Sequence, residues 1–127
     1  MNLQESGEMY LETIYVLSQS SAAVRAIDVG EYMGFSKPSV SRALGVLRQG
    51  GYVEADERGR LLLTEAGLSV AEKIYERHRV LAALLRAIGV DEKTAVGDAC
   101  RIEHVISDKT FEAIKAHFGN YGKAVEI

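Results

Sequence analysis

Only one cysteine, one proline and no tryptophan occur among the 127 residues of this sequence. The single cysteine, Cys100, excludes an internal disulfide and a zinc site built from cysteines alone. Scarce proline, together with abundant Ala, Leu, Glu and Arg, favours helices. No segment approaches the roughly 18 consecutive apolar residues of a membrane span, and the N-terminus lacks the basic start and apolar run of a secretory signal. We therefore expect a cytoplasmic protein with no membrane partner.

Positive charge is also in short supply, since 15 Lys and Arg residues face 18 Asp and Glu residues, for a net charge of −3. This balance argues against a protein that coats nucleic acid by charge alone. The charge is unevenly spread, however. Residues 36–51 carry Lys37, Arg42 and Arg48 and no acid, whereas residues 1–21 carry three glutamates and no base. An acidic chain with one basic segment can still bind DNA locally.

Hydrophobic periodicity and capping residues predict a mainly α-helical fold with one β-hairpin. A helix over 36–49 is the best defined, because Ser36 is a good N-cap, Pro38 lies in its first turn, and Val40, Leu44 and Leu47 form an apolar stripe. Asp56–Gly59 separates two short apolar runs, as in a hairpin. The other predicted helices cover 8–19 (capped by Ser6), 26–33, 64–88, 91–107 and 108–118, the strands cover 52–55 and 60–63, and 119–127 is a loose tail.

The order helix, tight turn, helix, hairpin is typical of a winged helix-turn-helix. In this arrangement the start of the second helix enters the major groove, where small hydroxyls allow close approach and Arg42 can bind guanine through two hydrogen bonds. Nearby arginines suit phosphate contacts. The candidate DNA-binding residues are Arg25, Ser36, Lys37, Pro38, Ser39, Ser41, Arg42, Arg48, Arg58 and Arg60. The alternative is a small helical domain whose hairpin and helices bind another protein.

Three potential metal ligands of different types lie close together in the C-terminal half. Cys100, Glu103 and His104 are spaced i, i+3 and i+4, which puts a thiolate, a carboxylate and an imidazole on one helix face. Such a set suits a transition metal. The spacing alone leaves a second interpretation open, in which Cys100 is a small buried apolar residue and the Glu-His pair lies on an ordinary surface.

Several segments of the sequence resemble the diphtheria-toxin-repressor family of metal-dependent transcriptional regulators, which has iron-responsive and manganese-responsive branches. They are EMYLETIYVL, FSKPSVSRALGVLRQGGYV, RGRLLLTEAG, RHRVLAALLRAIGVDE and DACRIEHVISD, and they cover the chain from Gly7 to about Phe118. The resemblance implies a homodimer with N-terminal winged helices and C-terminal dimerisation helices. A divalent metal between the two parts would prepare the dimer for a palindromic DNA operator.

The resemblance further implies a primary metal site formed by Met9, Cys100, Glu103 and His104. A Met and a Cys at these positions are similar to the iron branch, whereas the manganese branch has carboxylates at both. Because sulfur ligands favour metals softer or later than Mn(II), we expect Fe(II) first and Mn(II) second, with Co, Ni or Zn as substitutes in vitro. Glu12 and His78 match positions that hold a second metal in the manganese branch, and with Glu103 they form a possible second site.

These observations predict a DNA-binding domain over residues 1–64 and a helical metal-binding and dimerisation domain over 65–127. The predicted function is metal-dependent repression of metal-homeostasis genes rather than enzymatic catalysis. One alternative is a winged-helix regulator that senses an organic ligand, or a redox state through Cys100. A small metalloenzyme is the other, although the sequence has no Ser-His-Asp set, phosphate loop or HExxH motif.

Overall fold

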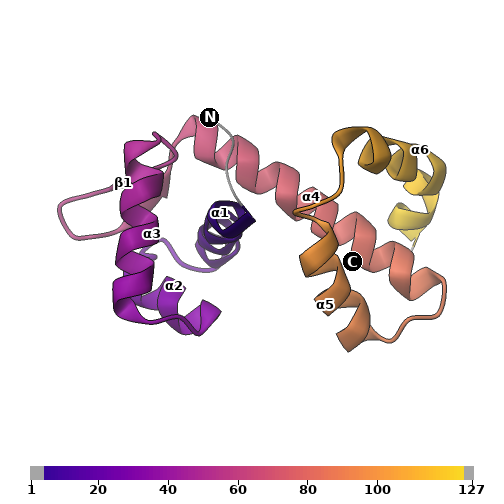
Figure 1. Ribbon diagram of the computed structural model, residues 1–127, viewed down its shortest axis with the longest axis horizontal. Helices are drawn as coiled ribbons and strands as arrows, with labels where there is room; N and C mark the ends of the chain where they lie inside the picture. The colour runs from indigo at the N-terminus through magenta and orange to yellow at the C-terminus, as the bar shows by residue number, and fades with distance from the viewer. Residues whose placement is uncertain (1–4, 125–127) are drawn as a thin grey trace. The chain divides into compact units, whose positions relative to one another are not determined.

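The computed structural model describes residues 5–124, and for residues 119–124 it describes the helical backbone alone. The chain divides into two compact units, and the boundary between them in the sequence lies between Glu72 and Lys73. The predicted mainly α-helical fold with a small hairpin is confirmed. In chain order the elements are α1 (Glu5–Ser18), α2 (Ala26–Met33), α3 (Lys37–Gln49), β1 (Val53–Ala55), β2 (Leu61–Leu63), α4 (Glu65–Ala87), α5 (Glu92–Ile102) and α6 (Asp108–Ala124) (Figure 1).

The core of the N-terminal unit is formed by α1, α2, α3 and the hairpin. Leu11 and Ile14 of α1 are completely buried, and they belong to one apolar cluster with Val29 of α2 and Val40 of α3. The apolar stripe predicted for α3 is confirmed, since its three members are all buried. Burying that stripe leaves the opposite face of α3 exposed to solvent.

The connection between α2 and α3 is a tight turn centred on Gly34. This glycine adopts a left-handed conformation with φ of 73°, and its N–H donates to Gly30 O at 2.8 Å, which ends α2. Ser36 begins α3 as its N-cap, because its Oγ accepts from the N–H of Ser39 at 3.3 Å. Both features were predicted from the sequence, and together they set the direction in which α3 leaves the turn.

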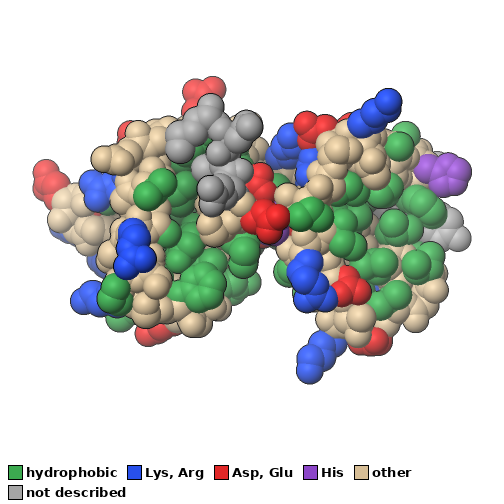
Figure 2. Space-filling view, viewed as in Figure 1, with side chains coloured by type: hydrophobic (Ala, Val, Ile, Leu, Met, Phe, Trp, Pro, Cys, Tyr) green, Lys and Arg blue, Asp and Glu red, His purple; other side chains and the backbone are tan. Residues whose placement is uncertain are grey.

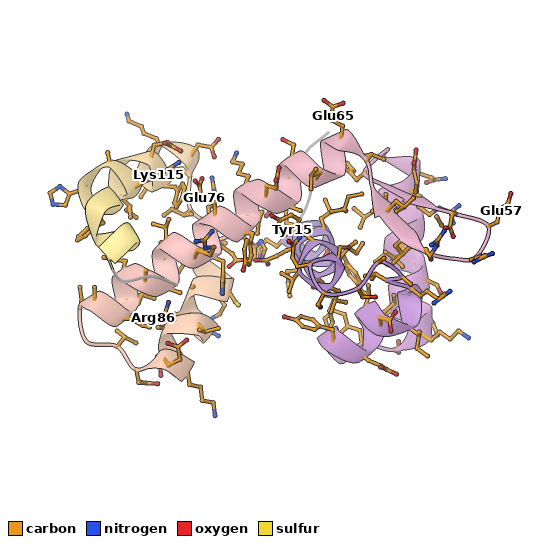
Figure 3. All side chains as sticks on the ribbon, turned by 180° about the vertical axis from the view of Figure 1, so that it is seen from behind. Tyr15, Glu57, Glu65, Glu76, Arg86 and Lys115 are labelled. Atoms are coloured by element: carbon orange, nitrogen blue, oxygen red, sulfur yellow. The ribbon has the colours of Figure 1, made fainter. Side chains whose placement is uncertain are left out.

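The hairpin is antiparallel, with Val53 opposite Leu63 and Ala55 opposite Leu61. Its strands are each one residue shorter than predicted, at their N-terminal ends. The N–H of Leu61 donates to Val24 O at 2.7 Å and so attaches the hairpin to the segment before α2. At its tip, Glu57 projects into solvent (Figure 3).

The C-terminal unit contains most of α4, together with α5 and α6. Leu81 and Ala82 of α4 and Ala99 of α5 form its small apolar core. Lys115 Nζ of α6 lies 2.9 Å from Glu76 Oε2 of α4, and Figure 3 shows the two side chains next to each other. This ion pair joins α6 to α4 along their exposed edges.

Three sequence-based helix boundaries are wrong. The helix predicted over 91–107 ends at Ile102, and residues 103–105 form a turn, so Glu103 and His104 follow α5 instead of continuing it. The expected loose tail is helical as far as Ala124, because interior glycines cost a helix only about 1 kcal/mol each. The first helix begins at Glu5, so Ser6 lies inside it and is not its cap. Residues 1–4 and 125–127 lie outside the described residues.

Within residues 5–124, no helix has an apolar stretch long enough to cross a lipid bilayer.

Candidate metal centre and nucleic-acid interface

Four possible metal ligands gather in the C-terminal unit. His78 lies on α4, Cys100 lies in the last turn of α5, and Glu103 and His104 lie in the turn that follows. One donor atom each from His78, Cys100 and Glu103 lies within 4.8 Å of the others. His104 Nε2 lies 3.4 Å from Glu103 Oε2. The unit therefore brings imidazole, thiol and carboxylate groups from two parts of the sequence to one place.

Glu103 is at the centre of this cluster and is completely buried. Its Oε1 lies 2.8 Å from His78 Nδ1, whereas its Oε2 is buried with no hydrogen-bond partner among the described residues. A buried carboxylate oxygen that accepts no hydrogen bond costs free energy. A cation next to Oε2 would remove that cost, so the residues present fit a bound metal ion.

His78 is the titratable group of the cluster that the structure perturbs most clearly. Its Nδ1 lies 3.7 Å from Cys100 Sγ in addition to its contact with Glu103. The hydrogen bond with Cys100, and to a smaller extent the one with Glu103, raises the pKa of His78 to about 10. The protonated imidazole thus places a positive charge next to the Glu103 carboxylate. A metal ion that takes this nitrogen as a ligand must displace the proton.

The remaining predicted ligands, Met9 and Glu12, belong to α1 in the N-terminal unit. Met9 is 38% exposed, so it does not belong to the core of the N-terminal unit. Glu12 is partly buried and takes part in an interaction of its own. They therefore lie on the same helix as the core residues Leu11 and Ile14, but on a less buried side of it.

The predicted DNA-reading residues occupy the exposed face of α3. Every one of them on this helix is exposed, and the helix contains no acidic residue: Lys37, Pro38, Ser39, Ser41, Arg42 and Arg48. The hydroxyl of Ser36 is committed to capping, and it also donates to Ser39 Oγ at 2.9 Å. Figure 2 shows Lys and Arg side chains on the surface of this unit with hydrophobic side chains between them.

The predicted DNA-binding arginines outside α3 differ in how far they are already bound to other groups of the protein. Arg25 Nε donates to the backbone oxygen of Arg58 at 3.2 Å, so it supports the hairpin loop. Arg60 Nε lies 2.5 Å from Asp56 Oδ2, and the backbone and side-chain hydrogen bonds of Arg60 lower the pKa of Asp56. Part of the positive charge of the hairpin is therefore already neutralised within the loop, which leaves Arg58 as its more available cation.

Sequence reasoning missed two further features. Val46 is a 53% exposed apolar side chain on α3. Arg77 is a buried cation on α4, and it lies between the buried Ile74 and Leu81 at spacings of three and four. That i, i+3, i+7 spacing places Arg77 on the buried stripe and was the available signal, although charged residues are rarely expected there.

Comparison with known proteins gives two adjacent family matches. The description "Iron dependent repressor, N-terminal DNA binding domain" matches residues 2–61, and "Iron dependent repressor, metal binding and dimerisation domain" matches residues 64–124.

Individual relatives are consistent with these matches. An uncharacterised HTH-type transcriptional regulator of Methanocaldococcus jannaschii is 30% identical over 115 residues, or 89% of this chain and 92% of that protein. The HTH-type transcriptional regulator MntR of Bacillus subtilis is 31% identical over 86% of this chain and 77% of its own length. The solved structure of the manganese regulator SloR aligns with a TM-score of 0.79 and 29% identity over 95% of this chain. This chain spans about half of that structure, 55%.

Proposed function

The chain belongs to the iron-dependent repressor family of metal-dependent transcriptional regulators, and we propose that it is a homodimeric repressor activated by Fe(II) or Mn(II). Residues 1–64 would bind a palindromic operator near metal-homeostasis genes in the cytoplasm, and residues 65–127 would bind metal and dimerise. The observation that carries the proposal is the cluster of His78 and Cys100 around the buried carboxylate of Glu103. The family to which the chain belongs consists of transcriptional regulators, so we set the metalloenzyme alternative aside.

The donor set supports a transition metal. We propose that Met9, Cys100, Glu103 and His104 hold the primary ion, and that His78 and Glu12, together with Glu103, hold a second one. When bound, the ion would supply concentrated positive charge to a carboxylate and a thiol. The thiol favours Fe(II), because sulfur ligands suit metals later than Mn(II), whereas the carboxylate suits both metals. The names of the relatives include manganese regulators, so both metals belong in the test.

DNA recognition would depend on the exposed face of α3. Arg42 would contact a guanine edge, while Lys37 and Arg48 would contact phosphates. The N-terminal end of α3 adds a favourable helix dipole for a phosphate. The lack of acids on this helix supports the same assignment, since none opposes the approach of the DNA backbone.

Packing within the N-terminal unit gives a physical route for metal control. Leu11 and Ile14 pack α1 against α2 and α3 in one apolar core. If Met9 and Glu12 are held as ligands, α1 loses freedom, and the orientation of α3 is restricted with it. DNA binding then costs less ordering free energy, which makes the two binding events mutually favourable.

The test is a DNA-binding titration without oxygen, with Fe(II), Mn(II) or no metal. The probe is the duplex that the full chain selects from a random library in the presence of each metal. We expect the metal to raise affinity by roughly 5- to 150-fold, the range of typical allosteric coupling. Cys100→Ala should lose this response while remaining a folded dimer. A metal response that is unchanged in Cys100→Ala and His104→Ala would contradict the assigned site.

A redox sensor is the second candidate, because Cys100 is an exposed thiol and its Sγ lies 3.7 Å from the imidazole of His78. The two candidates predict different results when an oxidant is added to the metal-free chain. A redox sensor would change its DNA affinity on oxidation without metal. The metal-dependent regulator we propose would change only with metal, and bound metal would protect Cys100 from alkylation.

A further inference from the structure

Arg77 is the most deeply buried cation described in the C-terminal unit, with a side chain that is 7% exposed. It directly precedes His78 in the sequence of α4. Its guanidinium also lies 5.5 Å from the ring centre of Phe111 on α6. Burying a guanidinium is costly unless hydrogen bonds and opposite charges compensate for the lost water.

The compensation comes from the segment between α5 and α6. Arg77 Nη1 donates to Ile106 O at 2.7 Å and to Glu103 O at 3.2 Å, and Nη2 donates to the carboxylate of Asp108. These acceptors lie 26 to 31 positions away in the sequence. One side chain thus contacts both ends and the middle of residues 103–108.

This segment is also the one that carries two of the proposed metal ligands. Residues 103–105 form a turn beyond the last turn of α5, where helix carbonyls lack partners within the helix. The backbone oxygen of Glu103 is held by Arg77 while its side chain reaches His78 at 2.8 Å. The guanidinium therefore fixes the backbone from which the Glu103 carboxylate extends.

We propose that Arg77 is a positioning residue for the metal site: it holds the segment 103–108 against α4 so that Glu103 and His104 meet His78 and Cys100. This inference rests on the proposed function of that cluster. Arg77 touches none of the four donor atoms and acts through the carbonyls of Glu103 and Ile106. A planar guanidinium suits this role, because its donors are fixed in a fork that one lysine ammonium does not reproduce.

The chain offers a matched control in Lys73, one turn earlier on α4. Its Nζ lies 2.8 Å from the same Asp108 carboxylate, and its side chain is 55% exposed. Lys73→Met removes one of the cationic partners of Asp108 but leaves the contacts with Glu103 and Ile106. A comparison of Arg77→Met, Arg77→Lys and Lys73→Met therefore distinguishes two effects. One is the loss of the hydrogen bonds that hold residues 103–108, and the other is the loss of a positive charge near Asp108.

The experiment uses Co(II) as the probe, because a cobalt–thiolate bond gives a near-ultraviolet charge-transfer band. Affinity is measured by competition with a fluorescent chelator, at a temperature where circular dichroism shows each metal-free variant to be folded. We expect Arg77→Met and Arg77→Lys to bind Co(II) about 10- to 100-fold more weakly, as supporting residues of metal sites usually do, with an altered band. Lys73→Met should match the unmodified chain.

Each other outcome has a definite meaning. Native Co(II) affinity and spectrum in folded Arg77 variants, with a loss of thermal stability alone, would show a purely structural role and overturn the inference. Failure of both Arg77 variants to fold would overturn it as well, since the residue would then be required by the fold itself. If the unmodified chain gives no cobalt–thiolate band, the proposed metal site fails and not merely the role of Arg77.

Discussion

Glu103 is the residue on which the metal account depends most. Its carboxylate is fully buried, and one oxygen contacts His78 while the other lacks a hydrogen bond within the described residues. A buried carboxylate usually has hydrogen bonds to both oxygens, because leaving one of them without a hydrogen bond is unfavourable. Its negative charge and its vacant lone pairs are the properties that a cation would use.

Glu103→Gln keeps the shape of this side chain and removes its charge. We expect metal affinity to fall by more than about 100-fold, beyond the roughly 10- to 100-fold typical of supporting residues. Isothermal titration calorimetry with Mn(II) measures the effect. Glu92→Gln is the control, because Glu92 is an exposed partner of Arg86 on the same unit (Figure 3 labels Arg86). Equal losses in the two variants would contradict a specific role for Glu103.

Asp108 gives a prediction about acid stability. The hydrogen bond and charge of Lys73, followed by the charge of Arg77, lower the pKa of Asp108 below its ordinary value of 3.8. A carboxyl whose pKa is lower in the folded chain stabilises the fold above its unfolded pKa and loses this contribution as the pH falls through the folded value. Asp108→Asn should therefore flatten the fall in stability below about pH 4 in urea unfolding. An unchanged pH profile would contradict the ion pair.

At the scale of elements, the turn between α2 and α3 was predictable because its signals are local. Glycine, serine and proline within Gly34–Pro38 specify the end of one helix and the start of the next, and the structure has both where the sequence placed them. Gly45 differs from Gly34, since it lies in the middle of α3 with ordinary helical geometry and open space around it.

Alanine substitution should therefore have opposite effects at these two glycines. At Gly34 a Cβ meets no neighbour, but φ of 73° costs an alanine about 1–2 kcal/mol of folding free energy. At Gly45 an alanine should stabilise α3 by up to about 1 kcal/mol, because it loses less backbone freedom on folding. Urea midpoints of the DNA-free chain measure both. Destabilisation by Gly45→Ala would contradict the open surroundings of that position.

The end of α5 was not predictable, because its cause is distant in sequence. Residues 98–105 contain no glycine or proline, so local signals let the helix continue to residue 107. Arg77, from α4, binds Glu103 O and Ile106 O and stabilises a turn in place of further helix. The spacing of Cys100 and Glu103 still predicted that these two lie close together, since Glu103 N donates to Ala99 O as in a helix. Family resemblance, and not spacing, singled out His78, but it placed His78 with Glu12 and Glu103, whereas the structure has His78 next to Cys100 and Glu103.

At the scale of the whole chain, two compact units share one continuous helix, α4. All four donors described in the cluster belong to the C-terminal unit. A ligand that binds the folded chain alone stabilises it by mass action. Metal should consequently act first on the unit that holds the donors.

We expect a free metal concentration of 100 times Kd to raise the free energy of unfolding by about 2.7 kcal/mol. Urea unfolding with and without Co(II) measures this gain, and hydrogen exchange locates it along the chain. Protection should increase around residues 78 and 100–104. Cys100→Ala should show little gain at the same metal concentration. An equal gain in that variant would indicate metal binding elsewhere on the chain.

The central claim is that metal and DNA bind with mutual preference, and thermodynamic reciprocity tests it most directly. Metal affinity is measured by chelator competition in the absence and presence of saturating selected duplex, without oxygen. The account predicts that DNA raises metal affinity by the same factor by which metal raises DNA affinity. Identical metal affinity with and without the duplex would contradict it.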